Sequence, residues 1–362
     1  MEDNYLIQGL DEYLRQEEPQ LRERGELWQT AIGLQQVDGL KTSDYLLQTA
    51  RQHIEGDISI TEAKKLIDSY YQSRAGRQGA DDDRTEEADK VATRIAEILS
   101  EKTFSFTPAQ LISIHRRLFT GIYKFAGKIR GYNITKREWV LRGQIVYYAS
   151  ADMITDTLNY DISQERDFDY SGLNIDESIR HLTRFCSNLW QIHAFGEGNT
   201  RTTAVFMIKY LRTLGFNVGN EQFAHHSWYF RNALVRANYN NLKEGITETT
   251  LFLELFFRNM LLGEQHPLLN RELHLDWKSS VKSAEEGFQS ANSIIPKSKN
   301  CTLTDLAVLR IIKESPAVTQ KQIAMQIGKS ERTVKTITSN LSERGLIIRR
   351  HGKRNGYWEI LD

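Results

Sequence analysis

Cysteine, proline and long apolar runs are all scarce in this 362-residue chain. The two cysteines, Cys186 and Cys301, lie far apart with no second pair near either, which excludes a disulfide framework and a cysteine-based metal site. Only 5 prolines occur, well below the average usage of about 5%, so we expect a mainly helical fold. No apolar stretch approaches the roughly 18 residues of a membrane span.

The chain also has no excess of charge of either sign, since 47 Lys and Arg balance 47 Asp and Glu. A chain that is polybasic or acidic throughout is therefore excluded, and a charged partner must meet a local patch. The start, Met1-Glu2-Asp3-Asn4, lacks the basic and apolar order of a secretory signal, so we expect a cytoplasmic protein. Its length predicts two to three domains of about 150 residues.

Helical periodicity dominates residues 6–71, where two helices are expected to meet near Glu55 and Gly56. The helical spacing of apolar residues breaks off at residues 134–148, which are predicted to form one β-hairpin. Downstream, apolar residues at spacings of three and four predict a helix with one buried face that ends at His193, and the next helix is expected to begin near Asn199.

Residues 193–201 read HAFGEGNTR and join these two helices. Glycines let backbone N–H groups approach an anion, and the N-terminus of a helix adds unpaired donors and the positive end of its dipole. A carboxylate at Glu197 suits Mg²⁺, and the guanidinium of Arg201 suits a phosphate. His193 is placed to act as a base. The alternative is an ordinary helix-to-helix turn in which the histidine completes an apolar seam.

The order and spacing of these nine residues resemble the signature of the Fic family, HxFx(D/E)GNxR, and the resemblance covers about residues 104–262. It implies a helical domain that transfers a nucleoside monophosphate, usually AMP from ATP, onto a protein hydroxyl. It also implies that His193 deprotonates the target and that Glu197 binds Mg²⁺. Phe195 would pack the loop into the core, and the phosphate-binding set would be Gly196, Gly198, Asn199, Thr200 and Arg201.

Further roles follow from the same resemblance. The hairpin would be a flap that docks the target by strand addition, through Trp139, Val140 and Leu141. Tyr229 and Phe230 would lie beside the nucleoside, although aromatic residues in a helical domain are as often plain core.

Two departures from the family pattern affect the predicted nucleotide site. Ala204 stands where many relatives carry a second arginine for the γ-phosphate, which leaves the nucleotide donor open. Residues 51–56, RQHIEG, resemble the family's inhibitory motif, so Glu55 is predicted to block the nucleotide site. Arg51 replaces the usual Ser or Thr, and an exposed pair between Arg51 and Glu55 on one helix face is the alternative.

From Leu303 onward the pattern predicts three helices followed by two strands around a basic turn, and the whole resembles a winged helix-turn-helix. Residues 303–362 hold 11 Lys and Arg against 6 Asp and Glu, a net charge of +5. DNA binding is favoured slightly over dimerisation or partner binding. The candidate DNA-binding residues are Arg332, Lys335, Arg349, Arg350, Lys353 and Arg354.

The resulting domain division is a helical region with an inhibitory helix at residues 1–103, a Fic core at 104–275, a helix end and linker at 276–302, and a winged helix at 303–362. The predicted activity is a protein adenylyltransferase that uses Mg²⁺ and ATP, acts on a protein target that includes itself as a candidate, and forms a homo-oligomer away from membranes. The alternatives are a DNA-binding regulator with a degenerate nucleotide site, and a Fic enzyme that transfers UMP or removes AMP.

Overall fold

A computed structural model of the chain describes residues 10, 13, 18–74, 80–170, 173–216, 221–277, 301–327, 329–351 and 356–361. Within these residues the chain is mainly helical, as predicted, with two small antiparallel sheets. No helix among them has the length and the apolar character that a membrane span requires. The predicted linker at 276–302 falls largely outside the described residues, and the domain boundaries stay predictions.

The N-terminal helices are α3 (Pro19–Gly33), α4 (Asp44–Glu55), α5 (Ile60–Arg74) and α6 (Ala80–Ser100), with the short helix η1 (Leu34–Asp38) after α3. Helix α4 begins where the Ser43 hydroxyl accepts a hydrogen bond from the Leu46 N–H. It ends at Gly56, whose φ of 89° lies in the left-handed region. The predicted meeting of two helices at this point is confirmed.

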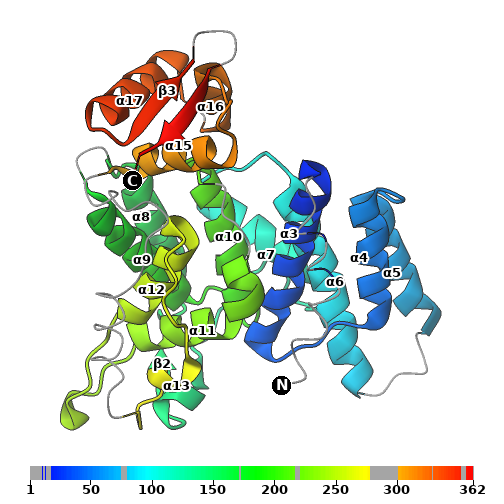
Figure 1. Cartoon of the computed structure of the whole chain (residues 1–362). Coiled ribbons are helices and arrows are strands. Elements are labelled where there is room, and N and C mark those ends of the chain that lie inside the picture. The colour runs from blue at the N-terminus through cyan, green and yellow to red at the C-terminus, as the bar shows by residue number, and fades with distance from the viewer. Residues whose placement is uncertain are drawn as a thin grey trace.

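The N-terminal helices pack closely on the rest of the domain. A side chain at Gly33 would place its Cβ atom 2.4 Å from the backbone of Ala224 on α11 (Glu221–Ala237), so only glycine permits this approach of α3. The hydroxyl of Ser227 on the same helix donates to the carbonyl of Gly33 at 2.7 Å. Residues near 30–40 are thereby held against the central helices (Figure 1).

The remaining helices of this body are α7 (Pro108–Phe119), α8 (Ile154–Arg166), α9 (Ile175–Ile192), α10 (Asn199–Thr213), η3 (Leu242–Glu244), α11 (Glu221–Ala237), α12 (Leu251–Leu262) and α13 (Asn270–Leu273). Among them, α10 packs against α6, α7 and α9. Helix α9 starts with a capping box between Asn174 and Glu177 and buries one face, as its periodicity predicts. Helix α10 is buried along nearly its whole length, so both of its ends are fixed by their neighbours.

The predicted hairpin is present but shorter than expected. Strands β1 (Thr135–Arg137) and β2 (Ile145–Tyr147) pair with Lys136 opposite Val146, and the 3₁₀ helix η2 (Trp139–Leu141) lies between them. Val140 and Leu141 are fully buried, and the Val140 carbonyl accepts a hydrogen bond from the Leu275 N–H at 3.0 Å. Those two residues therefore fix the hairpin to the domain.

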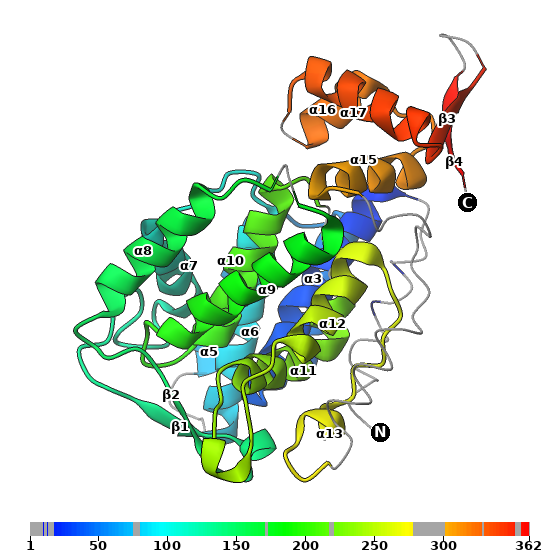
Figure 2. The ribbon, with the colours of Figure 1, turned by 90° about the vertical axis from the view of Figure 1, so that its left-hand side faces the viewer.

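The C-terminal domain has the predicted order of α15 (Leu303–Glu314), α16 (Gln320–Gln326), α17 (Glu331–Glu343), β3 (Ile347–Arg350) and β4 (Tyr357–Ile360). Ser330 caps α17 as expected by accepting from the Thr333 N–H. Helix α15 lies across the end of α10 in two perpendicular views (Figures 1 and 2). There a Cβ atom on Gly215, whose φ is 91°, would lie 3.1 Å from Ile327 and 3.2 Å from Ala307.

Candidate active site

The loop between α9 and α10 is shaped by two left-handed residues and one side chain. His193 ends α9 with φ 49° and ψ 55°, and Gly198 precedes α10 with φ 77° and ψ 10°. Between them the Asn199 amide accepts from the Phe195 N–H at 2.9 Å and donates to the Phe195 carbonyl at 2.8 Å. This pair closes the loop, so the first role of Asn199 is to shape the site.

His115 on α7 supports the loop from below. Its ring stacks on Phe195 with centroids 3.7 Å apart and an interplanar angle of 11°. Because His115 Nδ1 accepts from the Gly127 N–H at 2.8 Å, its Nε2 is the donor to the Glu197 carbonyl at 3.0 Å. Burial lowers the pKa of His115 to about 4, so the ring is neutral and keeps this tautomer.

Arg130 holds the loop from its other side. Its Nε donates to the carbonyl of His193 at 2.8 Å, and its backbone N–H donates to the Ala194 carbonyl at 2.9 Å. The same guanidinium reaches the carbonyls of Tyr132 and Ala149 at 2.6 and 2.5 Å. These bonds hold His193 in its left-handed conformation, which costs free energy for a residue other than glycine.

The His193 side chain is only 4% exposed, yet neither ring nitrogen has a hydrogen-bond partner. Its ring stacks on Tyr148 with centroids 3.8 Å apart. Desolvation, and after it the charge of Lys136, holds the pKa of His193 well below 6.5. The imidazole is therefore neutral at pH 7 and available to accept a proton, and a buried group without partners indicates a site for a ligand.

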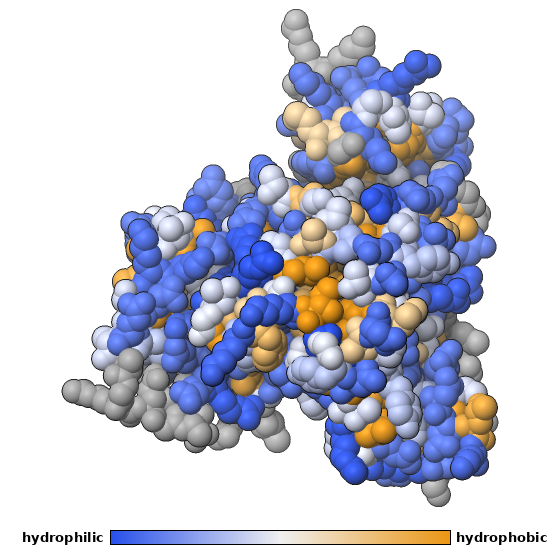
Figure 3. Space-filling model, turned by 180° about the vertical axis from the view of Figure 1, so that it is seen from behind, coloured by the Kyte–Doolittle hydropathy of each residue, from blue (hydrophilic) through white to orange (hydrophobic). Residues whose placement is uncertain are grey.

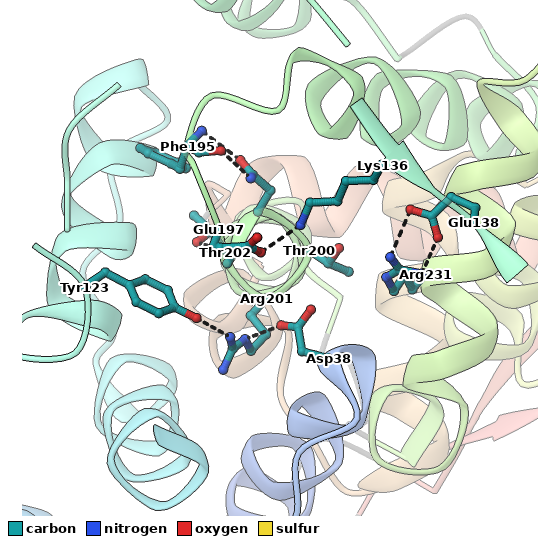
Figure 4. Close-up of polar contacts among 12 residues, drawn as sticks. Asp38, Tyr123, Lys136, Glu138, Phe195, Glu197, Thr200, Arg201, Thr202 and Arg231 are labelled. Carbon is teal, nitrogen blue, oxygen red and sulfur yellow. Dashed lines mark hydrogen bonds and ion pairs between the residues drawn. The ribbon is translucent and has the colours of Figure 1, made fainter. Parts of the chain in front are cut away.

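Glu197 faces the hairpin at the opening of the loop. Its Oε2 lies 2.7 Å from Nζ of Lys136 on β1, and both side chains are partly exposed (Figure 4). A single accessible carboxylate beside phosphate groups is an arrangement that Mg²⁺ accepts, because Mg²⁺ is usually held by one or two carboxylates together with substrate phosphates. Glu197 thus fits a metal that arrives with a nucleotide, provided that Lys136 gives up its contact. Among the described residues no cluster of three or more His, Cys, Asp or Glu forms a metal cage.

Arg201 is only 1% exposed and is surrounded by protein acceptors. Its Nη2 donates to Glu87 at 2.6 Å, its Nη1 donates to Gln35 at 3.1 Å, and its Nε lies 2.9 Å from Asp38. The hydroxyl of Tyr123 lies 3.3 Å from Nη2 (Figure 4). Burial acts to lower the pKa of Arg201, but Asp38, Tyr123 and Glu87 raise it overall, so the cation is stably paired. A phosphate would have to displace these acids to reach it.

Residues 105–211 match the Fic/DOC family model, and residues 301–356 match the MarR family model. The chain carries a Fic/DOC domain. Over 105 residues it is 26% identical to "Protein adenylyltransferase VbhT" of Bartonella schoenbuchensis, a match that spans 29% of this chain and only 21% of that protein. A crystal structure of a Fic family protein from Desulfovibrio desulfuricans G20 is similar with a TM-score of 0.43 and 12% identity, over 99% of this chain and 94% of that one.

Several residues with predicted roles in the Fic domain are buried in the structure. Phe230 packs against Phe223 and Phe256, and Tyr229 is 1% exposed, so both lie in the core of the domain, and their place beside the nucleoside stays a prediction. Val140 and Leu141 are buried, which leaves Trp139, at 52% exposure, as the accessible member of the predicted docking set.

The other predicted loop residues are in or beside the site. Thr200 accepts a hydrogen bond from Trp190 Nε1 at 3.0 Å, so its hydroxyl has a structural partner. A Cβ atom on Gly196 would lie 2.9 Å from the hydroxyl of Tyr132, the end of an exposed side chain. Ala204, in place of a second arginine, is fully buried.

Glu55, the predicted inhibitory residue, ends α4 and accepts a hydrogen bond from the Tyr13 hydroxyl. The acids on Arg201 are instead Asp38 and Glu87. Sequence reasoning missed these two, as well as His115, Arg130 and Lys136. Their distance from residues 193–201 in the sequence explains why none carried a signal of its own.

The winged helix presents a polar face on α17. Arg332, Thr333, Lys335 and Thr336 are exposed there, and Lys335 pairs with Glu331 at 2.9 Å. Hydrophilic side chains cover much of this domain on the side seen in Figure 3. On the strands, the Arg349 guanidinium lies over the Trp358 ring, and Arg350 pairs with Glu359 at 2.5 Å. Lys353 and Arg354 lie outside the described residues.

Proposed function

We propose that this chain is a Fic-type protein adenylyltransferase that moves AMP from ATP onto a Ser, Thr or Tyr hydroxyl of a protein. The observation that carries the proposal is the neutral, buried and unpartnered imidazole of His193 beside the N-terminus of α10. The first N–H groups of that helix have no partner within it and no capping side chain, so they suit a phosphate. The name of the Bartonella relative supports the same chemistry.

In the proposed reaction His193 accepts the proton of the target hydroxyl as the oxygen attacks the α-phosphorus. The new O–P bond replaces the bond to the β-phosphate oxygen, and pyrophosphate leaves. Glu197 would hold Mg²⁺, which neutralises phosphate charge when bound. The backbone donors at the start of α10 would receive the charge that develops on the α-phosphate.

Intact-protein mass spectrometry after incubation with Mg²⁺ and each nucleoside triphosphate separately tests this function. We expect an adduct of AMP mass on this chain or on an added protein, absent in His193→Ala and present in the control variant His225→Ala, whose histidine is exposed. An adduct of UMP mass would show that the enzyme transfers UMP and not AMP. Loss of AMP from a modified substrate would show that the enzyme removes AMP and does not add it. Failure of every variant with every triphosphate would refute the transferase and favour the degenerate-site alternative.

Autoinhibition by Glu55 remains part of the proposal, and the acids on Arg201 offer a direct comparison. If Glu55 restrains the enzyme, Glu55→Gly raises adduct formation above wild type. Asp38→Asn provides the matched test for the acid that the structure places on Arg201. An increase with Asp38→Asn alone would move the inhibitory role to η1.

We propose DNA binding by the winged helix as a second function, because α17 presents an exposed polar face within a domain that matches the MarR family. Fluorescence anisotropy with duplex DNA at increasing salt tests it. Binding that weakens with salt, and a smaller salt slope in Arg332→Ala, are expected. Equal binding by wild type and Arg332→Ala would remove Arg332 from the DNA contact. Absence of binding by wild type would favour a dimerisation or partner-binding role instead, with sedimentation as the check on a homo-oligomer.

A further inference from the structure

The arginines around the Fic loop already have partners within the protein. Arg201 is enclosed by Asp38 and Glu87, and Arg130 donates to backbone carbonyls. Arg231 makes two hydrogen bonds, of 2.7 and 3.0 Å, to the nearly buried carboxylate of Glu138. Ala204 supplies no charge where a second arginine is common. A nucleotide that enters this site therefore meets few cations that are free to turn toward its phosphates.

Lys136 differs from these arginines in exposure and in partner. Its side chain is 28% exposed, and its Nζ contacts Glu197 Oε2, which belongs to a side chain that is 51% exposed. Exposed ion pairs of this kind contribute little to stability, so the ammonium group can leave the carboxylate at low cost. Figure 4 shows the side chain reaching from β1 toward Glu197 and the start of α10.

The strand sets this direction. Successive side chains of a strand point to opposite faces, so Lys136 points toward the loop, whereas Thr135 and Arg137 on either side are exposed. The charge of Lys136 also acts at the reaction centre, because it is the largest charge effect that lowers the pKa of His193. The ammonium thus belongs electrostatically to the catalytic site.

We propose that Lys136 is a phosphate-binding residue of the nucleotide site, whose ammonium passes from Glu197 to a phosphate of the bound nucleotide. This inference rests on the proposed nucleotide-transfer function. The exchange satisfies both partners, because Glu197 is released for Mg²⁺ as the ammonium gains an anionic oxygen. It also brings β1 of the hairpin against the nucleotide, so that nucleotide binding and the position of the flap become linked.

Isothermal titration of the full chain with Mg²⁺-ADP tests the assignment without requiring catalysis. We expect Lys136→Ala to weaken binding about ten- to a hundredfold, which is the range for one charge-assisted hydrogen bond. Lys136→Arg should retain more affinity than Lys136→Ala. The matched control is Arg137→Ala, which removes an exposed cation of the adjacent residue on the same strand and should bind as wild type does. Thermal melts of all four proteins should coincide.

The outcomes separate this inference from the function beneath it. Equal affinity of wild type and Lys136→Ala would overturn the role of Lys136 and leave the nucleotide site in place. Tighter binding by Lys136→Ala would also overturn it, because Lys136 would then act as a competitor for Glu197. If Arg137→Ala weakened ADP binding as much as Lys136→Ala does, the inference would also be overturned, because the effect would come from the loss of any positive charge or from disruption of the flap. Absence of ADP binding by wild type would overturn both proposals together.

Discussion

Substitution of Arg201 by alanine tests whether the guanidinium ties the N-terminal helices to the Fic core. Its side chain is 1% exposed and faces two carboxylates, at 2.9 Å from Asp38 and 2.6 Å from Glu87. Removing one partner of a buried ion pair costs about 3–5 kcal/mol, because the remaining charges lose their compensation. Asp38 is 30% exposed and Glu87 is 17% exposed. Water relieves part of the penalty, so we expect a loss near the low end, about 3 kcal/mol.

For a domain of about 150–250 residues, a loss of about 3 kcal/mol corresponds to a melting temperature lower by roughly 6–12 °C. Differential scanning fluorimetry of the full chain measures this shift. Arg184→Ala provides the control, since this arginine lies on the exposed face of α9 and its loss should change stability by less than about 0.5 kcal/mol.

A double-mutant cycle sharpens the test. Glu87→Gln leaves Arg201 paired with Asp38 and should cost about 1–2 kcal/mol. Arg201→Ala combined with Glu87→Gln should cost less than the sum of the two single changes, because the second substitution removes an uncompensated carboxylate. Two results would refute the conclusion that this cluster stabilises the fold. One is strict additivity of the two single changes, and the other is an Arg201→Ala protein with the melting temperature of wild type.

Four further predictions concern the catalytic loop and the hairpin. Because desolvation keeps the pKa of His193 well below 6.5, the rate of adduct formation should stay level from pH 8 down through 6.5; a decline centred on 6.5 would show an ordinary, solvated histidine. Because the pKa of His193 is lower in the folded protein than in the unfolded chain, its contribution to stability is complete above pH 6.5 and is lost as the pH falls from 6.5 toward the pKa of the folded state. Melting temperatures measured at decreasing pH follow this loss. In urea unfolding, Gly198→Ala should lower stability by about 1–3 kcal/mol more than the control Gly121→Ala. Both glycines have φ 77°, but only at 198 would the Cβ atom lie 2.4 Å from the Phe119 ring, so equal losses would contradict this prediction. Trp139→Ala should impair modification of a protein target while leaving Mg²⁺-ADP affinity unchanged, because the indole is exposed on the hairpin; weaker ADP binding would place it in the nucleotide site instead.

The catalytic loop was predictable because its chemistry is contiguous. Nine residues carry the turn, the amide, the base and the carboxylate, and His193, Phe195 and Glu197 need no distant information to be found. The residues that hold the loop in shape come from other segments of the chain. His115 donates to one backbone carbonyl of the loop and Arg130 donates to several backbone carbonyls, and such contacts leave no pattern in a sequence.

The errors have physical causes of the same kind. Trp139, Val140 and Leu141 form an apolar run between turn residues, which favours a strand in sequence terms. In the structure Arg142 adopts a left-handed conformation with φ 55°, and the run closes into a 3₁₀ turn that buries two of its three side chains. Burial of Val140 and Leu141 on the domain outweighs their strand propensity.

The acids on Arg201 show how the fold brings together residues that a local regulatory motif does not mark, while the inhibitory role of Glu55 stays a prediction. Glu55 was predicted from a local pattern, and the region that bears it does meet the Fic core. One carboxylate on Arg201 belongs to Glu87 on α6, and the other belongs to Asp38 at the end of η1. Helix η1 follows Gly33, which packs on α11 with no room for a side chain. The close packing at Gly33 therefore helps to position Asp38 against the guanidinium. Any change that shifts η1, including one far from the loop, should alter the charge around the start of α10.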